Sequence, residues 1–285
     1  MSTIASAVLL GVGVLLAGNL LWAPILAPLN LRFLPSVPWA IVPMAIYLGL
    51  YWAFISGAIG ASDSAAMRRE SLRARPLPPL VWAAALVTGL IGFAAVLALT
   101  AVMARLIVMP VSQIVTPPAM PAVTAIALLM MASVVAGVTE EAAFRGYMQS
   151  PIERQYGLAV AILVNGAMFG LLHFPTHPGA VVVMLPYYIA VAAVYSGLTW
   201  ATNSILPAMA LHVGGDIWSL IRLWATGKAE WQRSDAVQAL VWDGGLDASF
   251  VSAVGLCAAF SIGTFMLCRQ LRGFAITLPS ERPSD

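Results

Sequence analysis

Eight apolar stretches of about 20 residues run through this sequence, and each is long enough to cross a lipid bilayer as a helix. Inside a bilayer every backbone polar group needs a partner within the protein, and a helix supplies these partners within one segment. The sequence therefore predicts an all-α fold, a polytopic membrane helical bundle with about eight transmembrane helices. The stretches cover residues 4–29, 37–61, 80–108, 121–150, 157–174, 180–202, 206–226 and 248–271.

The composition excludes a soluble globule of this size. Hydrophobic residues make up 61% of the 285 residues and charged residues only 9%, whereas a soluble domain carries about 25% charged residues. The excess apolar surface has to face lipid, so the bilayer is the first expected partner. No repeat divides the chain, and we expect a single transmembrane domain over residues 1–285. A net charge of +2 is too small to indicate nucleic acid as a partner.

Arginines gather at one set of the predicted loops. The segment 62–79 holds four of them, the connection near residue 154 holds another, and the C-terminal tail holds more. The opposite side carries Arg32, Lys228 and Arg233, with Arg105 near a helix end. Because cytoplasmic loops are enriched in Lys and Arg, we expect both termini in the cytoplasm. Thirteen of the 14 basic residues are Arg, which is typical of a GC-rich bacterial genome and favours the bacterial inner membrane.

Most charged residues fall in the predicted loops, and the ionisable residues within the apolar stretches are concentrated in three of them. A charged side chain at the bilayer centre costs at least about 2.5–3.5 kcal/mol, so three such segments call for a common explanation. Mutual burial in one polar cavity provides it. The residues are Glu140, Glu141, Arg145, His173, His212 and Asp216.

The two adjacent glutamates are predicted to differ in their partners. Glu141 and Arg145 are spaced i, i+4, so they share a helix face and form an ion pair. Glu140 is rotated by about 100° from Glu141 on an α-helix. It is therefore not engaged by Arg145, which makes Glu140 the candidate general base.

The same spacing recurs twice further along the chain. Phe169 and His173 share one helix face, and so do His212 and Asp216. Between the latter two, residues 214–215 are both glycine and leave the helix without bulk beside His212. We expect this space to receive either a substrate backbone or a neighbouring helix.

These residues form three motifs: EExxxR at residues 140–145, FxxxH at 169–173 and HxxxD at 212–216. In this order, each on an apolar helix, they resemble the CPBP family of CAAX proteases and bacteriocin-processing enzymes, also called the Abi family. A eukaryotic relative is the Ras-converting CAAX endopeptidase. The resemblance covers about residues 121–220, which we take as the catalytic motif region.

The resemblance implies an intramembrane endopeptidase that hydrolyses a peptide bond near the cytoplasmic leaflet by glutamate-activated water. It implies that Glu140 and His173 activate the water, and that His212 and Asp216 stabilise the oxyanion. The implied partner is a peptide or protein substrate at the membrane. Whether that substrate is prenylated does not follow from the motifs.

Three further residues are assigned supporting roles, namely Glu141, Arg145 and Phe169. Asp216 departs from the form of the motif that has Asn. A carboxylate accepts hydrogen bonds and donates one only when protonated, so orienting His212 is the more suitable role for Asp216.

Other functions use similar residues. Two histidines, a glutamate and an aspartate can ligate zinc. Here they form no compact ligand motif, and the zinc-binding signature HExxH is absent from the sequence. Since the resemblance also implies chemistry without a metal, we expect no cofactor and no metal. A proton-coupled transporter also buries such residues, although it usually shows inverted repeats. A catalytically idle membrane binding or immunity protein of the same fold is the remaining alternative.

Overall fold

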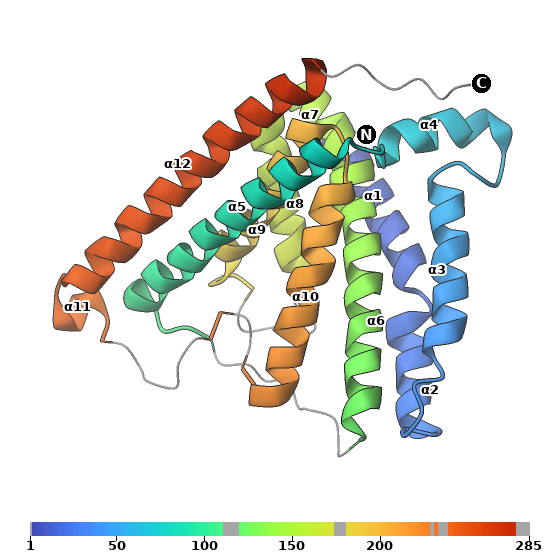
Figure 1. The fold of residues 1–285 in the computed structure, drawn as a ribbon, viewed down its shortest axis with the longest axis horizontal. Coiled ribbons are helices and arrows are strands. Elements are labelled where there is room, and N and C mark those ends of the chain that lie inside the picture. Colours follow the sequence, from blue (N-terminus) through green and yellow to red (C-terminus); the bar gives the residue numbers. More distant parts are fainter. Residues whose placement is uncertain (1, 111–119, 174–180, 229–230, 233–238, 278–285) are drawn as a thin grey trace.

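Helices, joined by turns and irregular segments, are the only regular secondary structure in the part of the chain that the computed structural model describes, which is residues 2–110, 120–173, 181–228, 231–232 and 239–277. This confirms the predicted fold class of a polytopic helical bundle (Figure 1). The helices are α1 (Thr3–Asn19), η1 (Trp22–Leu26), α2 (Ala27–Arg32), α3 (Ile41–Ile55), α4 (Ser62–Leu72), α5 (Pro79–Leu106), α6 (Ala122–Glu140), η2 (Glu141–Met148), α7 (Gln149–Tyr156), α8 (Leu158–Leu172), α9 (Leu185–Thr202), α10 (Leu206–Thr226), α11 (Val241–Gly244) and α12 (Ala248–Thr277).

Each of the eight predicted apolar stretches coincides with a helix or with a run of consecutive helices. Four segments of the described chain are both long and apolar enough to cross a membrane: Thr3–Arg32, Pro79–Leu106, Ala122–Tyr156 and Ala248–Phe274. Two further apolar helices, Ile41–Ile55 and Leu158–Leu172, are shorter. These segments support an integral membrane protein, while the number of eight transmembrane helices stays a prediction.

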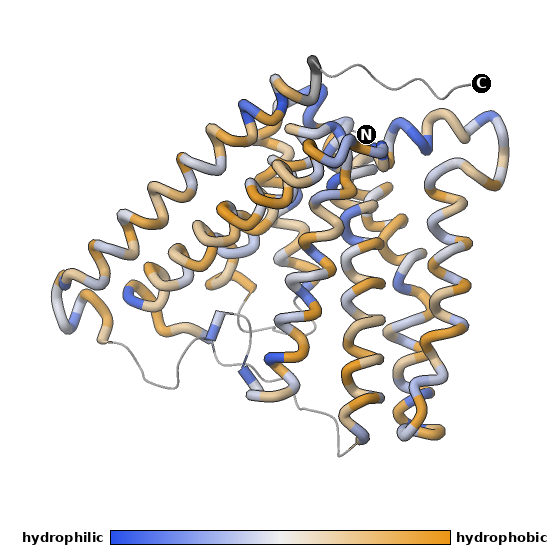
Figure 2. Tube along the Cα trace, in the orientation of Figure 1, coloured by the Kyte–Doolittle hydropathy of each residue, from blue (hydrophilic) through white to orange (hydrophobic). Residues whose placement is uncertain are grey.

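Two boundaries differ from the prediction for local reasons. The first stretch is interrupted by η1, where Pro24 has no N–H to donate and the next bond runs from the Leu26 N–H to the Leu21 carbonyl over 2.9 Å. The segment 62–79, which we expected to be a loop, contains the polar helix α4. Figure 2 shows α4 as a hydrophilic element beside the largely hydrophobic α3 and α6.

The start of α1, the helix α4 and the end of α12 lie at the same end of the bundle (Figure 1). Seven of the 13 arginines lie in α4 or just after it, in α7, or near the end of α12. One end of the molecule is therefore basic, as the loop charges predict. We call it the basic end; its assignment to the cytoplasm remains a prediction.

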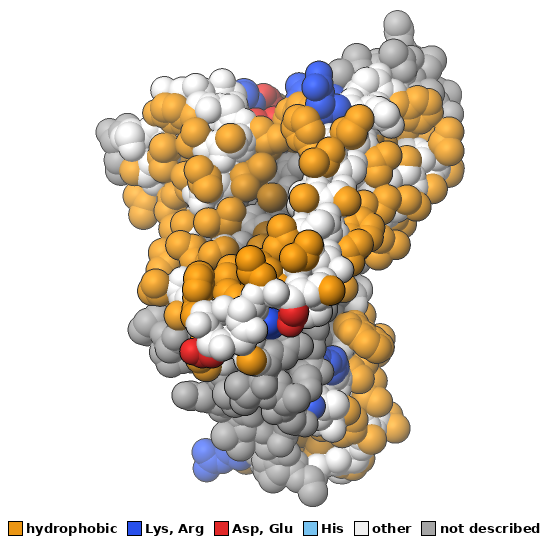
Figure 3. All heavy atoms as spheres, turned by 90° about the vertical axis from the view of Figure 1, so that its left-hand side faces the viewer, with side chains coloured by type: hydrophobic (Ala, Val, Ile, Leu, Met, Phe, Trp, Pro, Cys, Tyr) orange, Lys and Arg blue, Asp and Glu red, His pale blue; other side chains and the backbone are white. Residues whose placement is uncertain are grey.

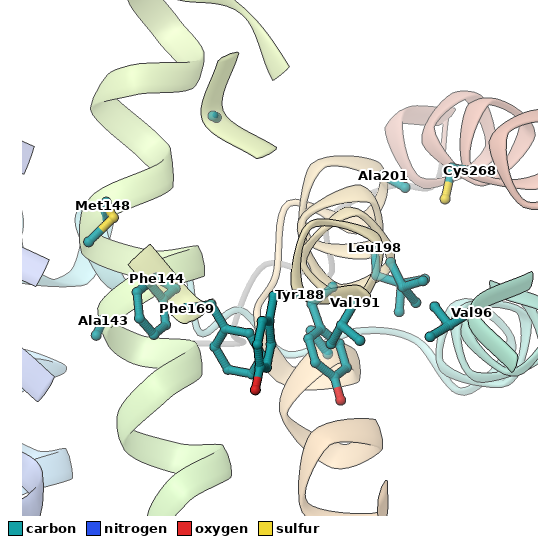
Figure 4. Packing of buried hydrophobic residues seen from close by; sticks show 14 of the residues in the cluster. Val96, Ala143, Phe144, Met148, Phe169, Tyr188, Val191, Leu198, Ala201 and Cys268 are labelled. Carbon is teal, nitrogen blue, oxygen red and sulfur yellow. The ribbon is translucent and has the colours of Figure 1, made fainter. Parts of the chain in front are cut away.

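The main hydrophobic core connects the motif region with the inclined helices α5 and α12. Figure 4 shows this core extending from Phe144 and Met148 through Phe169 and Tyr188 to side chains near Cys268. The helix α9 lies in the middle and contributes to it along most of its length. The segment that holds the three motifs is therefore packed into the bundle.

A close approach of two helices brings the motifs together. At Gly137 on α6, a Cβ atom would lie 2.5 Å from Val213 Cγ2 and 3.1 Å from the Val213 backbone nitrogen on α10. Val213 follows His212 directly, and Gly137 lies one turn before the two glutamates. Glycine at this position therefore allows the first motif to reach the third.

We predict that Gly137→Ala destabilises the protein by about 1–3 kcal/mol, because the added methyl group meets a backbone atom that cannot yield easily. Gly13→Ala on α1 is the matched control, since its Cβ atom would meet nothing within 4 Å of the described residues. Removing that glycine should leave stability unchanged or slightly raised. Thermal unfolding of both variants in detergent measures the difference, and equal stabilities would contradict the close approach.

Candidate active site

The two glutamates stand at a change of helix type. The α-helix α6 ends at Glu140 and the π-helix η2 begins at Glu141. Short π-helical segments inside α-helices are often found at functional sites. The segment is held from outside by Arg73, which donates a hydrogen bond to the Arg145 carbonyl over 3.3 Å and pairs with Glu153 at 3.2 Å.

The predicted pair of Glu141 and Arg145 is present. Arg145 Nη1 lies 3.1 Å from Glu141 Oε1, and both side chains are fully buried. The two groups are at ion-pair distance, but the guanidinium makes no well-aligned hydrogen bond to any described residue. Three aromatic rings complete its surroundings, with centroids 4.9 Å (Tyr195), 5.5 Å (Phe169) and 5.6 Å (Phe144) from the Arg145 Cζ atom. One carboxylate and three ring faces therefore stabilise this buried cation.

The same carboxylate also holds the third motif. His212 Nδ1 donates a hydrogen bond to Glu141 Oε1 over 2.8 Å. The His212 ring is stacked on Tyr195, with a centroid distance of 4.9 Å and an interplanar angle of 16°. Glu141 therefore joins η2 to α10 and fixes the orientation of the His212 ring, a role that we had expected Asp216 to fill.

Two other carboxylates face the opposite nitrogen of His212. Glu140 Oε2 lies 3.8 Å and Asp216 Oδ2 lies 3.6 Å from His212 Nε2. Their side chains are 17% and 31% exposed, whereas that of Glu141 is 0% exposed. These exposures agree with the different roles predicted for the two glutamates. Glu141 is buried in an ion pair, whereas Glu140 is accessible, as a general base has to be.

His173 lies in the turn after α8, one residue beyond the helix in which we predicted it. Its Nδ1 is 2.8 Å from the Phe169 carbonyl oxygen. A carbonyl only accepts, so Nδ1 carries the proton, and Nε2 is the acceptor nitrogen of the neutral ring. The His173 ring is stacked on Tyr188 with centroids 4.8 Å apart.

Phe169 connects the second motif with the other two. Its ring centroid lies 4.8 Å from that of His173 and 6.0 Å from that of His212. It also contacts Arg145, as described above. All three motifs therefore meet around one aromatic ring, as mutual burial predicts.

Two tyrosines of α9 belong to the site but to none of the three sequence motifs. Tyr188 is stacked on His173 and Tyr195 on His212, so each motif histidine rests on one tyrosine ring. The two tyrosines are seven residues apart and share a helix face. Two tyrosines with this spacing on an apolar helix could have been identified from the sequence as candidate site residues. The spacing does not show which histidine each tyrosine contacts.

Space remains beside His212. At Gly214 and at Gly215 a Cβ atom would meet no described atom within 4 Å. The space that the glycines provide is therefore not occupied by a neighbouring helix of the described chain. Nor do the described residues contain a group of three His, Cys, Asp or Glu side chains arranged to hold a metal ion.

The family comparison bears on the same segment. Residues 122–218 match the Rce1-like family, described as type II CAAX prenyl endopeptidase Rce1-like. The match covers 97 of the 285 residues and contains all three motifs. It confirms the predicted resemblance to CAAX proteases for this segment and supports a protease-like function of the CAAX type. The searches of the curated proteins and of the solved structures gave no match.

We predict that Glu141 and Arg145 are coupled in stability. Glu141→Leu should destabilise the protein by about 3–5 kcal/mol because it leaves a buried guanidinium without its carboxylate. Adding Arg145→Met to that variant removes the orphaned charge and should restore part of the loss. Unfolding in detergent of both single variants and the double variant gives the coupling energy.

The matched control combines the same arginine substitution, Arg145→Met, with a substitution of the other glutamate, Glu140. Glu140→Leu and Arg145→Met should combine additively, since the structure pairs Arg145 with Glu141. Strong coupling of Arg145 to Glu140, together with a harmless Glu141→Leu, would show that the roles of the two glutamates are reversed.

Proposed function

We propose that this chain, with its Rce1-like segment at residues 122–218, is an intramembrane endopeptidase in which Glu140 activates the attacking water. The observation that carries the proposal is the difference between the two glutamates. Glu141 is buried and bound to both Arg145 and His212, while Glu140 is partly exposed and faces His212 Nε2. Glu140 is therefore the carboxylate available to take a proton.

The first step uses the carboxylates around His212 Nε2. The distances of 3.8 Å and 3.6 Å are longer than direct hydrogen bonds and suit a shared water. Glu140 accepts a proton from this water as its oxygen attacks the substrate carbonyl carbon. In the proposal, Nε2 of His173 is a second acceptor that orients the water, since its Nδ1 is committed to the Phe169 carbonyl.

The second step concerns the oxyanion. His212 already donates from Nδ1 to Glu141, so when protonated it presents Nε2–H to the carbonyl oxygen as negative charge develops there. Asp216, 3.6 Å from Nε2, balances the charge of that ring. When the tetrahedral intermediate collapses, the C–N bond breaks and Glu140 returns its proton to the leaving amine, so that a carboxylic acid and an amine result.

The proposed substrate is a peptide or protein segment presented at the cytoplasmic leaflet. The open space beside Gly214 and Gly215 suits an extended backbone that passes His212. The gathering of Arg residues at one end supports a cytoplasmic orientation of that end. Because the family description refers to CAAX prenyl substrates, prenylated and unprenylated CAAX peptides are suitable first probes.

We predict that Glu140→Gln lowers cleavage by about 100-fold or more, because an amide retains the shape but cannot act as a base. The assay uses full-length protein in proteoliposomes, a farnesylated CAAX peptide and its unprenylated form, and mass spectrometry of the products. Glu70→Gln is the control, since Glu70 forms an exposed ion pair with Arg154 and should keep wild-type rates. Unchanged cleavage by the Glu140 variant would refute the assignment. A wild-type protein that cleaves neither peptide nor co-expressed membrane proteins would favour an idle binding protein.

We also predict that activity is independent of added metal. If water is activated by Glu140 and His173 alone, exhaustive chelation should leave the cleavage rate unchanged, and purified protein should hold far less than one metal ion per chain. Stoichiometric zinc that restores a stripped enzyme would contradict this and would make the glutamates or histidines metal ligands.

A further inference from the structure

A groove lies along the face of α9 opposite to the two tyrosines of the candidate site. It has a volume of about 240 Å³ and is enclosed by α5, α8, α9 and α12. Its lining is apolar almost throughout, with small residues such as Gly92, Ala193 and Gly197 on the inner helices. Figure 3 shows that hydrophobic side chains cover much of the face formed by α5 and α12, with basic side chains along its upper edge.

The length of the groove matches one leaflet of a bilayer. On α12 its lining runs from Cys257 to Cys268, eleven residues that span about 16 Å at 1.5 Å per residue. The hydrocarbon core of a bilayer is about 30 Å thick, so one leaflet contributes about half of that. The groove is therefore long enough for one acyl chain and too short for a segment that crosses the membrane.

Two arginines stand at the end of the groove that lies towards the basic end. The Arg272 Cζ atom lies 4.1 Å from the ring centroid of Trp200, and the Arg269 Cζ atom lies 5.9 Å from that of Phe265. Trp200 and Phe265 both line the groove. Each arginine follows a groove-lining residue of α12 by one turn and therefore shares a helix face with the groove.

Two other arginines near the basic end are neutralised by carboxylates. Arg73 pairs with Glu153, and Arg154 pairs with Glu70. Within the described chain, neither Arg269 nor Arg272 has a carboxylate within ion-pair distance. Positive charge is thus placed at one end of an apolar groove, and no acidic side chain of the described residues lies within ion-pair distance of it.

We propose that this groove binds an anionic phospholipid. One acyl chain lies between α5, α9 and α12, and the headgroup phosphate binds Arg269 and Arg272. The planar guanidinium is well suited to a phosphate because two parallel N–H donors meet two oxygens. Basic pockets between membrane helices commonly bind anionic headgroups on the cytoplasmic side, and here the apolar groove fixes the lipid chain as well.

The test compares retention of two lipids by full-length protein. Protein purified in mild detergent is mixed with phosphatidylglycerol or phosphatidylcholine, and bound lipid is counted by native mass spectrometry. Wild type should retain phosphatidylglycerol about tenfold better than phosphatidylcholine. Arg269→Gln/Arg272→Gln should lose this preference, whereas Arg269→Lys/Arg272→Lys should keep part of it, because lysine retains the charge but not the paired N–H donors. Arg32→Gln is the control, since Arg32 is the last residue of α2, and α2 lies across the bundle from α12 (Figure 1).

A second variant tests the position of the acyl chain. Ala193→Phe fills the groove without changing charge and should lower retention of both lipids several-fold. Equal retention of the two lipids by wild type, or an unchanged preference in the double Gln variant, would overturn the headgroup assignment. Unchanged retention by Ala193→Phe would overturn the groove as the chain site. Glu140→Gln should bind lipid like wild type, which separates this proposal from the proposed catalysis.

Discussion

The carboxylate of Glu141 is the interaction on which the site depends. A buried guanidinium in a membrane bundle is costly unless it is paired, and Glu141 lies 3.1 Å from Arg145 with both side chains fully buried. The same oxygen accepts the hydrogen bond of His212. A single group therefore neutralises one motif and orients another, and the chain must bring α10 against η2 to satisfy it.

The contacts of Glu141 with Arg145 and His212 make the surroundings of Glu141 differ from those of Glu140, although the two residues are adjacent and chemically identical. Because Glu141 is used by Arg145 and His212, Glu140 is left facing the other nitrogen of the His212 ring. The two glutamates lie on either side of the change from α6 to η2. The proposed base is thus defined as much by what its neighbour binds as by its own surroundings.

Aromatic rings position the charged and histidine side chains of this site, a task that polar groups often have in a soluble enzyme. The face of Tyr195 supports both Arg145 and His212, and Tyr188 supports His173. Rings hold these side chains in place without introducing polar atoms that need partners in an apolar interior. The helix α9 therefore acts as the platform of the site, and its opposite side lines the proposed lipid groove.

By itself the sequence determined the helical membrane bundle, because a chain with 61% hydrophobic and 9% charged residues cannot cover a soluble globule. It also determined the pairing of Glu141 with Arg145, since i, i+4 spacing is a local property of a helix. The approach of α6 to α10 at Gly137, the hydrogen bond from His212 to Glu141 and the tyrosines under the histidines were decided only by the tertiary structure. Each of these joins segments far apart in the sequence, and helical periodicity shows which face a residue occupies but not which helix will pack against that face.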